Sequence, residues 1–141
     1  MLAGIVFGVI DKNNATEIET CLQDGKGEAE LAYDAFTHIE QGTKEELVTG
    51  FSELASVVEA LPATLTQCKS IASDVAELQS WAAAVLEVPT ADLQATIKAN
   101  CLSHAVALTL DVRKSRKLWV AEEYFQFGAE LGTMLVIATT F

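Results

Sequence analysis

Residues 45–58 read EELVTGFSELASVV and residues 122–135 read EEYFQFGAELGTML, so one phrase occurs twice at a spacing of 77 positions. The identical residues are Glu45, Glu46, Glu53 and Leu54 in the first copy and Glu122, Glu123, Glu130 and Leu131 in the second. Each copy follows a predicted turn, and acids in a first helical turn complement the helix dipole. We interpret each copy as the second arm of a helical hairpin. The two related hairpins, roughly 16–58 and 93–135, then form an internal repeat that arose by duplication.

The composition favours helices in one domain. Half of the 141 residues are hydrophobic, and the chain holds only 8 Gly and 2 Pro. A chain of this length buries a substantial core, and abundant Ala, Leu and Glu favour helix over strand. No apolar alternation of period two persists along the sequence. We therefore predict a single all-α domain over 1–141, a helical bundle of about six helices built from two related helical hairpins.

Capping residues and apolar periodicity place the helices. The expected segments are a short apolar helix over 2–10, a helix over 16–41, one that starts at Thr43, one from Pro62 to Val85, one from Thr90 to Val112, and one from about Ala121. Two glycines in 24–27 should weaken or kink the second helix. Thr43 and Glu46 have the spacing of a capping box. Pro62 suits a first helical turn, where its missing N–H has no cost.

The charge is strongly negative and unevenly distributed. The formal net charge is −11, so nucleic acids and anionic membranes are poor partners. Residues 17–53 contain ten acids and two Lys or Arg, whereas Arg113, Lys114, Arg116 and Lys117 form the one concentrated basic cluster. This cluster is either a solvated helix end or a docking patch for an acidic surface, and the two interpretations are compatible.

No residue set indicates a catalytic or metal-binding chemistry. Cys101 and His104 share a helical face, but a structural metal needs four ligands and a catalytic one at least three. The sequence contains no Gly-rich phosphate loop, nucleophile elbow or HExxH motif. We therefore expect no enzyme activity, no catalytic residues, no metal and no cofactor. The apolar segments at the two ends are too short to span a bilayer.

Cysteines and a sequon bear on the compartment. Cys21 and Cys68 lie on the core faces of two predicted helices, where they are either a disulfide or two buried thiols. A bridge would close a loop of about 48 residues and stabilise the fold by roughly 4 kcal/mol in the chain-entropy model. Asn14 begins an Asn-Ala-Thr glycosylation sequon in a predicted turn. Together these features favour an extracellular protein.

Several short motifs resemble those of a known family. The matching residues are Gly4 and Gly8; Cys21, Leu22 and Asp24; Leu61, Pro62, Leu65, Cys68, Lys69, Asp74, Val75, Leu78, Trp81 and Ala82; and Tyr124, Phe125, Phe127, Gly128, Leu131 and Gly132. With these motifs the chain resembles a family of small secreted helical proteins of ciliates and related protists. The resemblance implies secretion, a helical fold and a Cys21–Cys68 disulfide, and it implies no activity. Cys101 departs from the pattern, and we expect it to be free and buried.

Three functions fit these observations. The first is a structural or assembly subunit of an extracellular filament, coat or large complex that associates with copies of itself. Its expected assembly contacts are Leu2, Ile5, Val6, Ile10, Arg113, Lys114, Arg116, Lys117, Met134, Leu135, Ile137 and Phe141. The second is a carrier of lipid or another apolar ligand, with the aromatic-rich residues 119–127 either lining a ligand groove or packing between the hairpins. The third is an accessory subunit of a hetero-oligomeric complex.

Overall fold

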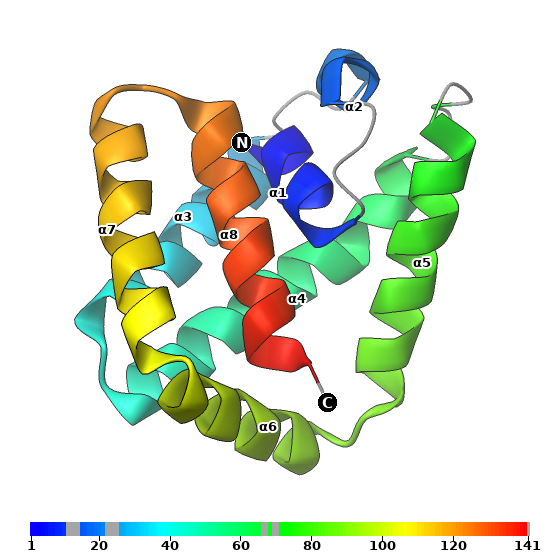
Figure 1. Cartoon of the computed structure of the whole chain (residues 1–141). Coiled ribbons are helices and arrows are strands. Elements are labelled where there is room, and N and C mark those ends of the chain that lie inside the picture. The colour runs from blue at the N-terminus through cyan, green and yellow to red at the C-terminus, as the bar shows by residue number, and fades with distance from the viewer. Residues whose placement is uncertain (11–14, 22–25, 66–67, 69–70, 141) are drawn as a thin grey trace.

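The computed structural model describes residues 1–10, 15–21, 26–65, 68 and 71–140. Within these residues the chain forms eight α-helices and no strand (Figure 1). The helices are α1 (Leu2–Val9), α2 (Ala15–Cys21), α3 (Lys26–Gln41), α4 (Lys44–Leu65), α5 (Ala72–Glu87), α6 (Thr90–Ser103), α7 (Ala105–Val120) and α8 (Tyr124–Thr139). The all-α prediction is confirmed, and the predicted number of about six helices is too low.

Two helices organise the packing of the others. In Figure 1, α8 lies at the centre between α1 and α7, α4 passes behind it, and α6 runs below. The helix α3 packs along α4, α5 packs against the other end of α4, and α4 also touches α8. The two copies of the repeated phrase therefore fall on α4 and at the start of α8. Each of these helices is the second arm of a hairpin, α3–α4 or α7–α8.

Aromatic side chains fill the junction between the two hairpins. Tyr33 of α3 stacks on Trp119 of α7, with ring centroids 4.2 Å apart. Phe36 of α3 meets Phe127 of α8 edge to face at 5.0 Å, and Trp119 also contacts Phe127 at 5.1 Å. Phe36 and Phe127 are fully buried. These rings pack between the hairpins, which is one of the two roles predicted for the aromatic-rich residues 119–127.

Glycines bring the first and last helices unusually close together. A Cβ atom added to Gly4 of α1 would lie 1.9 Å from the carbonyl oxygen of Phe125 in α8. On the opposite helix, a Cβ atom added to Gly128 would lie 2.0 Å from the carbonyl oxygen of Met1. Gly8 and Gly132, four residues further along each helix, are similarly close to the facing backbone. The two GxxxG motifs therefore form the contact between α1 and α8.

Two predicted boundaries around α4 and α5 are wrong. Pro62 lies inside α4, one turn before the helix ends at Leu65, and it does not begin a helix. Proline in a helix interior removes one backbone hydrogen bond, but Leu61, Pro62 and Leu65 are all buried, so packing of this turn compensates for that loss. The apolar stripe predicted from Pro62 to Val85 is accordingly divided between α4 and α5.

Two further boundaries differ in the second half of the chain. The helix predicted from Thr90 to Val112 is interrupted at His104, whose backbone has φ −115° and ψ 26°. The sequence has neither Gly nor Pro there to signal this break. The last helix starts at Tyr124 and not near Ala121, because Glu122 adopts a positive φ of 61° and ends the preceding turn. Glu122 therefore lies outside α8, Glu123 is its N-cap, and the first turn of α8 contains no acid, unlike that of α4.

The first half of the chain follows the prediction more closely. The amide of Glu46 donates a 3.3 Å hydrogen bond to the Oγ1 of Thr43, which is one half of the predicted capping box. Glu45 and Glu46 occupy the first turn of α4, as expected. The predicted helix over 16–41 consists of α2 and α3, and most of the predicted kink at 24–27 lies outside the described residues.

Candidate interaction surface

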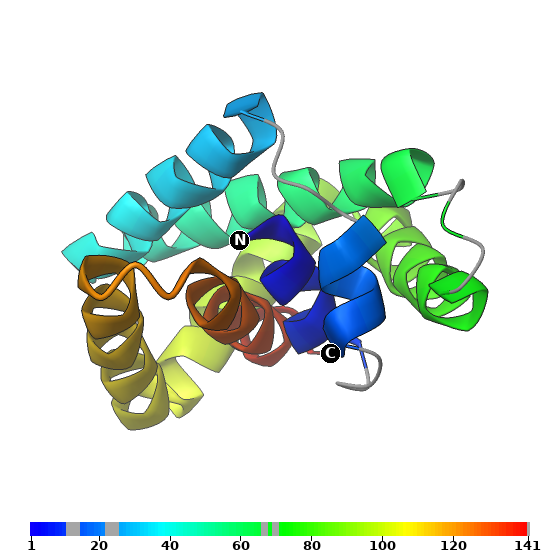
Figure 2. The same ribbon diagram turned by 90° about the horizontal axis from the view of Figure 1, so that it is seen from above.

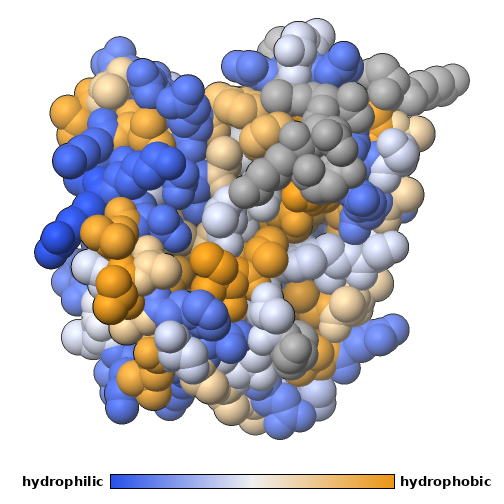
Figure 3. Space-filling view, in the orientation of Figure 1, coloured by the Kyte–Doolittle hydropathy of each residue, from blue (hydrophilic) through white to orange (hydrophobic). Residues whose placement is uncertain are grey.

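An outward-facing stripe on α7 combines large apolar side chains with cations. Val106 is 77% exposed and Leu110 is 58% exposed, and these residues are one helical turn apart. Arg113 adjoins them around a shallow surface depression, and Lys117 follows one turn later. Residues spaced by three or four positions share one helix face. We call Val106, Leu110, Arg113 and Lys117 the α7 stripe, and Figure 3 shows hydrophobic side chains on the face over α7.

Sequence reasoning missed the apolar half of this stripe. The apolar periodicity that predicts a helix from Thr90 to Val112 passes through Leu108, which the structure buries. Val106 and Leu110 form a second apolar row on the opposite side of the same helix. A helix with two apolar rows buries one in the core and leaves the other for a partner or for solvent. Their i, i+4 spacing was the available signal.

A groove lies between α3 and α4, where the two helices diverge. They meet at their shared turn and separate toward the N-terminal end of α3 (Figure 2). The groove has a volume of about 420 Å³. Its lining residues are Glu28 and Leu31 of α3 and Glu53, Ser56, Val57 and Ala60 of α4. The lining of this α3–α4 groove therefore combines three apolar side chains with two carboxylates and one hydroxyl.

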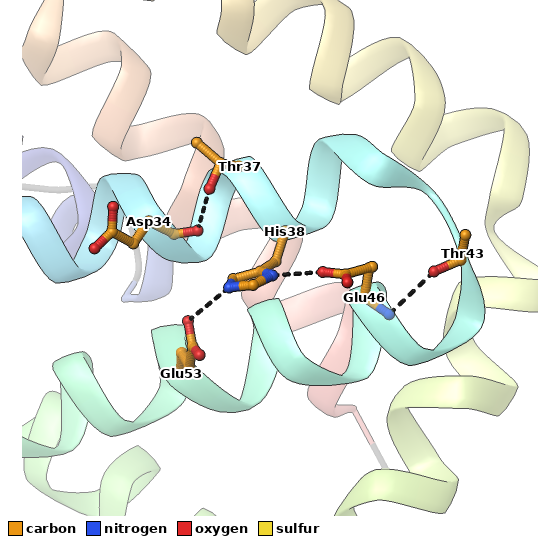
Figure 4. Close-up of polar contacts among 6 residues, drawn as sticks. All are labelled: Asp34, Thr37, His38, Thr43, Glu46 and Glu53. Carbon is orange, nitrogen blue, oxygen red and sulfur yellow. Dashed lines mark hydrogen bonds and ion pairs between the residues drawn. The ribbon is translucent and has the colours of Figure 1, made fainter.

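His38 joins α3 to α4 beside this groove. Figure 4 shows its Nδ1 directed at the carboxylate of Glu46 and its Nε2 directed at Glu53, 3.9 Å from Oε2. The hydrogen bond to Glu46 raises the pKa of His38 above its ordinary value, opposed by desolvation and assisted by the nearby charges of Glu53, Glu46 and Asp34. Glu46 thus completes the link to α3 instead of returning to Thr43 as a full capping box requires.

The α7–α8 hairpin contains a similar link. Glu130 of α8 forms a 2.7 Å ion pair with Lys114 of α7, and this hydrogen bond raises the pKa of Lys114. Glu53 and Glu130 occupy the same position in the repeated phrase. Each carboxylate therefore faces the first arm of its own hairpin, which gives the repeated acid a structural role.

Half of the predicted basic docking cluster is engaged inside the chain. The guanidinium of Arg116 forms a forked ion pair with Glu40 of α3 and donates a 3.2 Å hydrogen bond to the hydroxyl of Tyr33. These hydrogen bonds raise the pKa of Arg116 above its ordinary value. With Lys114 bound to Glu130, Arg113 and Lys117 are the members of the cluster on the exposed stripe.

The apolar ends are largely used within the chain. We expected them to contact another copy, but Leu2, Ile5, Val6, Met134 and Leu135 are each at most 2% exposed. They are buried because α1 packs against α8. Ile10 and Ile137 are half-buried at the edge of the same core, and Phe141 lies outside the described residues. A partner that binds this fold must therefore use other side chains.

The cysteines pair as predicted. Cys21 of α2 and Cys68 form a disulfide with Cα atoms 6.0 Å apart, which lies within the usual range. Cys68 is buried as predicted, but Cys21 is exposed and does not lie on a core face. Cys101 is free and buried, and its burial raises the pKa of the thiol to about 11. The thiol is therefore protonated at neutral pH and is a poor nucleophile.

Other predicted features are only partly described. Asn14 lies outside the described residues, so its glycosylation stays a prediction. Among the described residues, no group of three or more His, Cys, Asp or Glu side chains is placed to hold a metal ion. None of the described helices is both long and apolar enough to cross a bilayer.

These features define a small, disulfide-bonded, all-helical protein with an apolar stripe on its surface. The chain belongs to the SctB-like family, described as Secreted protein B-like, which it matches over residues 1–138. No curated protein and no solved structure matches the chain. The family description and the disulfide agree with the predicted extracellular location, while the lineage expected from the resemblance stays a prediction.

Proposed function

We propose that this protein is a secreted, non-enzymatic structural subunit that assembles with copies of itself through the α7 stripe. The exposure of Val106 and Leu110 on one helix face carries the proposal. Isolated exposed apolar residues are ordinary, but adjoining ones bordered by charge are typical of a protein-binding surface. In this proposal the stripe supplies the apolar contact area that we expected from the two ends of the chain, which are buried.

The expected association is weak per contact. Complete burial of Val106 and Leu110 contributes about 3–6 kcal/mol at the usual value for large aliphatic side chains. Association costs an estimated 4–15 kcal/mol in lost rotational and translational freedom. Burial of the stripe alone therefore does not hold two copies together, and the surface that receives the stripe must contribute favourable contacts as well. This balance favours an assembly that depends strongly on protein concentration.

Two observations support a structural and extracellular role. The disulfide and the family description favour an oxidising compartment. The groups most able to perform chemistry are already engaged, since His38 links two helices and the Cys101 thiol is buried and protonated. These side chains serve the fold, which fits a non-enzymatic subunit.

Sedimentation velocity of the disulfide-intact protein over a series of concentrations tests the proposal. We expect species larger than the 15.1 kDa chain at micromolar to millimolar concentrations. Val106→Glu should weaken this association about tenfold or more, whereas Leu86→Glu should not, because Leu86 is also exposed, at 64%, but lies on α5. A monomer at every concentration contradicts self-assembly and leaves the accessory-subunit hypothesis, in which the stripe binds a different protein.

The α3–α4 groove supports a second candidate function. Its volume of about 420 Å³ lies within the range of small-molecule sites, and Leu31, Val57 and Ala60 line it. A carrier of an apolar ligand would use this groove. Native mass spectrometry of gently purified protein distinguishes the two functions, because a carrier retains its bound molecule and the mass of the complex then exceeds that of the chain.

The hairpins also support the proposed duplication. The hairpins α3–α4 and α7–α8 have the same order of arms, and Glu53 and Glu130 face the first arm in each. The helices α1 and α5 pack against the second arm of the opposite hairpin. Superposition of residues 16–58 on 93–135 in an experimental structure should match two helices and their turn, and unrelated crossing angles would refute the duplication.

A further inference from the structure

We propose that the α7 stripe of one copy binds in the α3–α4 groove of a second copy, so that copies join head to tail. This inference rests on the proposed self-assembly and adds the identity of the receiving surface. The groove is lined by the apolar side chains of Leu31 and Val57 together with the carboxylates of Glu28 and Glu53. The stripe presents Val106 and Leu110 followed by a cation, Arg113. The groove therefore carries negative charge beside its apolar side chains, and the stripe carries positive charge beside its own.

The spacing along the two helices agrees. Val106 and Arg113 are seven residues apart on α7, and Glu53 and Ala60 are seven residues apart on α4. Seven residues span about 10.5 Å in any α-helix. When α7 lies antiparallel to α4 of the neighbour, Val106 faces Ala60 at the same time as Arg113 faces Glu53. Antiparallel helices also align their dipoles favourably.

Ala60 makes room for this contact. It is a small exposed residue on the groove wall, and Leu31 stands 57% exposed on the facing helix. A branched apolar side chain from α7 can therefore enter between them and cover Leu31. Without an occupant, Leu31 is one of the large apolar side chains that the described residues leave exposed. Occupation of the groove removes apolar area from water on both copies.

A copy cannot fill its own groove. Figure 2 shows the open angle between α3 and α4 and the outer side of α7 at different edges of the molecule. The two surfaces differ, so the contact is heterologous, and such contacts generate open chains or closed rings. The net charge of −11 also favours contact between unlike surfaces. If two grooves faced each other, Glu28 and Glu53 of one copy would lie close to the same carboxylates of the other copy and repel them.

Complementary blocked variants test the pairing. Val106→Glu blocks the stripe and leaves the groove intact, whereas Leu31→Glu blocks the groove and leaves the stripe intact. Both positions are exposed, so circular dichroism and thermal unfolding should show unchanged folding. Leu86→Glu makes the same chemical change on α5 and serves as the control. Each blocked variant should associate roughly ten- to hundredfold more weakly than wild type.

Mixing the two blocked variants gives the decisive result. We expect a 1:1 complex that grows no further, because only one stripe and one groove remain usable in each pair. If Leu31→Glu assembles like wild type while Val106→Glu does not, the groove assignment is wrong and stripe-mediated assembly stands. If both lose assembly yet stay monomeric when mixed, head-to-tail pairing is also wrong. A monomeric wild type refutes the proposed self-assembly itself.

Two further measurements test the register of α7 on α4 and the alternative that an apolar ligand occupies the groove. Arg113→Glu and Glu53→Arg should each weaken association several-fold, and the double variant should recover it, since the charge pair is only reversed. Failure of the double variant to recover refutes the register. An apolar molecule detected by native mass spectrometry that is lost in Leu31→Glu and retained in Val106→Glu assigns the groove to a ligand and overturns the proposal.

Discussion

The substitution Gly4→Ala tests the contact between the two terminal helices. The new Cβ atom would lie 1.9 Å from the carbonyl oxygen of Phe125 and 2.8 Å from the amide nitrogen of Ala129. Ordinary van der Waals contact begins at 3.4 Å, so the gap to the carbonyl oxygen must widen by 3.4 − 1.9 = 1.5 Å. Both obstructing atoms belong to the backbone of α8 and cannot rotate away, so α1 must shift as a body.

The magnitude follows from two opposing effects. Overpacking of a tight contact lowers the free energy of unfolding by about 1–3 kcal/mol. Replacing Gly by Ala inside a helix raises it by up to about 1 kcal/mol. Because the backbone is obstructed, we expect a net loss of about 1–2 kcal/mol. Complete detachment of α1, with exposure of Leu2, Ile5 and Val6, sets an upper limit of about 5–9 kcal/mol.

Urea unfolding followed by circular dichroism measures this loss, and hydrogen exchange of the α1 amides reports whether that helix detaches. Ala83→Gly on the exposed side of α5 is a matched control, because it measures helix propensity without any close contact. The control should lose about 1 kcal/mol. If Gly4→Ala unfolds at the same urea concentration as wild type or at a higher one, the close approach of α1 and α8 is refuted.

The remaining predictions concern the other links in the fold. Removal of the disulfide by Cys21→Ser with Cys68→Ser should lower the free energy of unfolding by roughly 4 kcal/mol, and an unchanged urea midpoint contradicts its role. His38 has a raised pKa, so its contribution to stability is present below pH 6.5 and is lost as pH rises through the folded pKa. The stability of His38→Gln should therefore fall short of wild type most at acidic pH, and equal differences at pH 5.5 and 8.5 refute this. Ser52 holds a buried hydroxyl without a hydrogen-bond partner among the described residues. Ser52→Ala should raise the unfolding midpoint, since an unpaired buried hydroxyl costs about 1–3 kcal/mol, and a lowered midpoint shows that the hydroxyl is used. Raising the salt concentration should strengthen self-association, because screening reduces repulsion between copies of charge −11 more than it weakens one surface ion pair; an assembly held mainly by ion pairs weakens instead.

Features set by local chemistry could be predicted from the sequence. The Thr43–Glu46 spacing located the start of α4. The apolar spacing between Pro62 and Val85 identified the row of Val75, Leu78, Ala82 and Val85 that α5 buries. The Cys21–Cys68 bridge was one of two alternatives until the resemblance favoured it. Local signals suffice where a residue acts on its own helix or carries one dominant chemistry.

Features that depend on tertiary packing could not be predicted. Pro62 lies within α4 because the turn that contains it is buried, and this gain outweighs one lost hydrogen bond. The break at His104 serves the change of direction between α6 and α7, and nothing in the local sequence encodes it. Sequence alone also could not show that Glu46 would choose His38 over Thr43, since the choice needs α3 beside α4.

The apolar ends show why hydropathy did not locate the proposed interaction surface. Their strong hydrophobicity suggested that they would contact another copy, but the two ends pack against each other within one chain. Gly4 and Gly128 let α1 and α8 approach until little apolar surface remained exposed there. Pairing the termini in this way leaves the second apolar row of α7 as exposed apolar surface without a described partner on its own chain. High hydrophobicity in a sequence therefore points to assembly only after the contacts among the chain's own helices are known. Here those contacts change the predicted assembly residues from the termini to Val106 and Leu110.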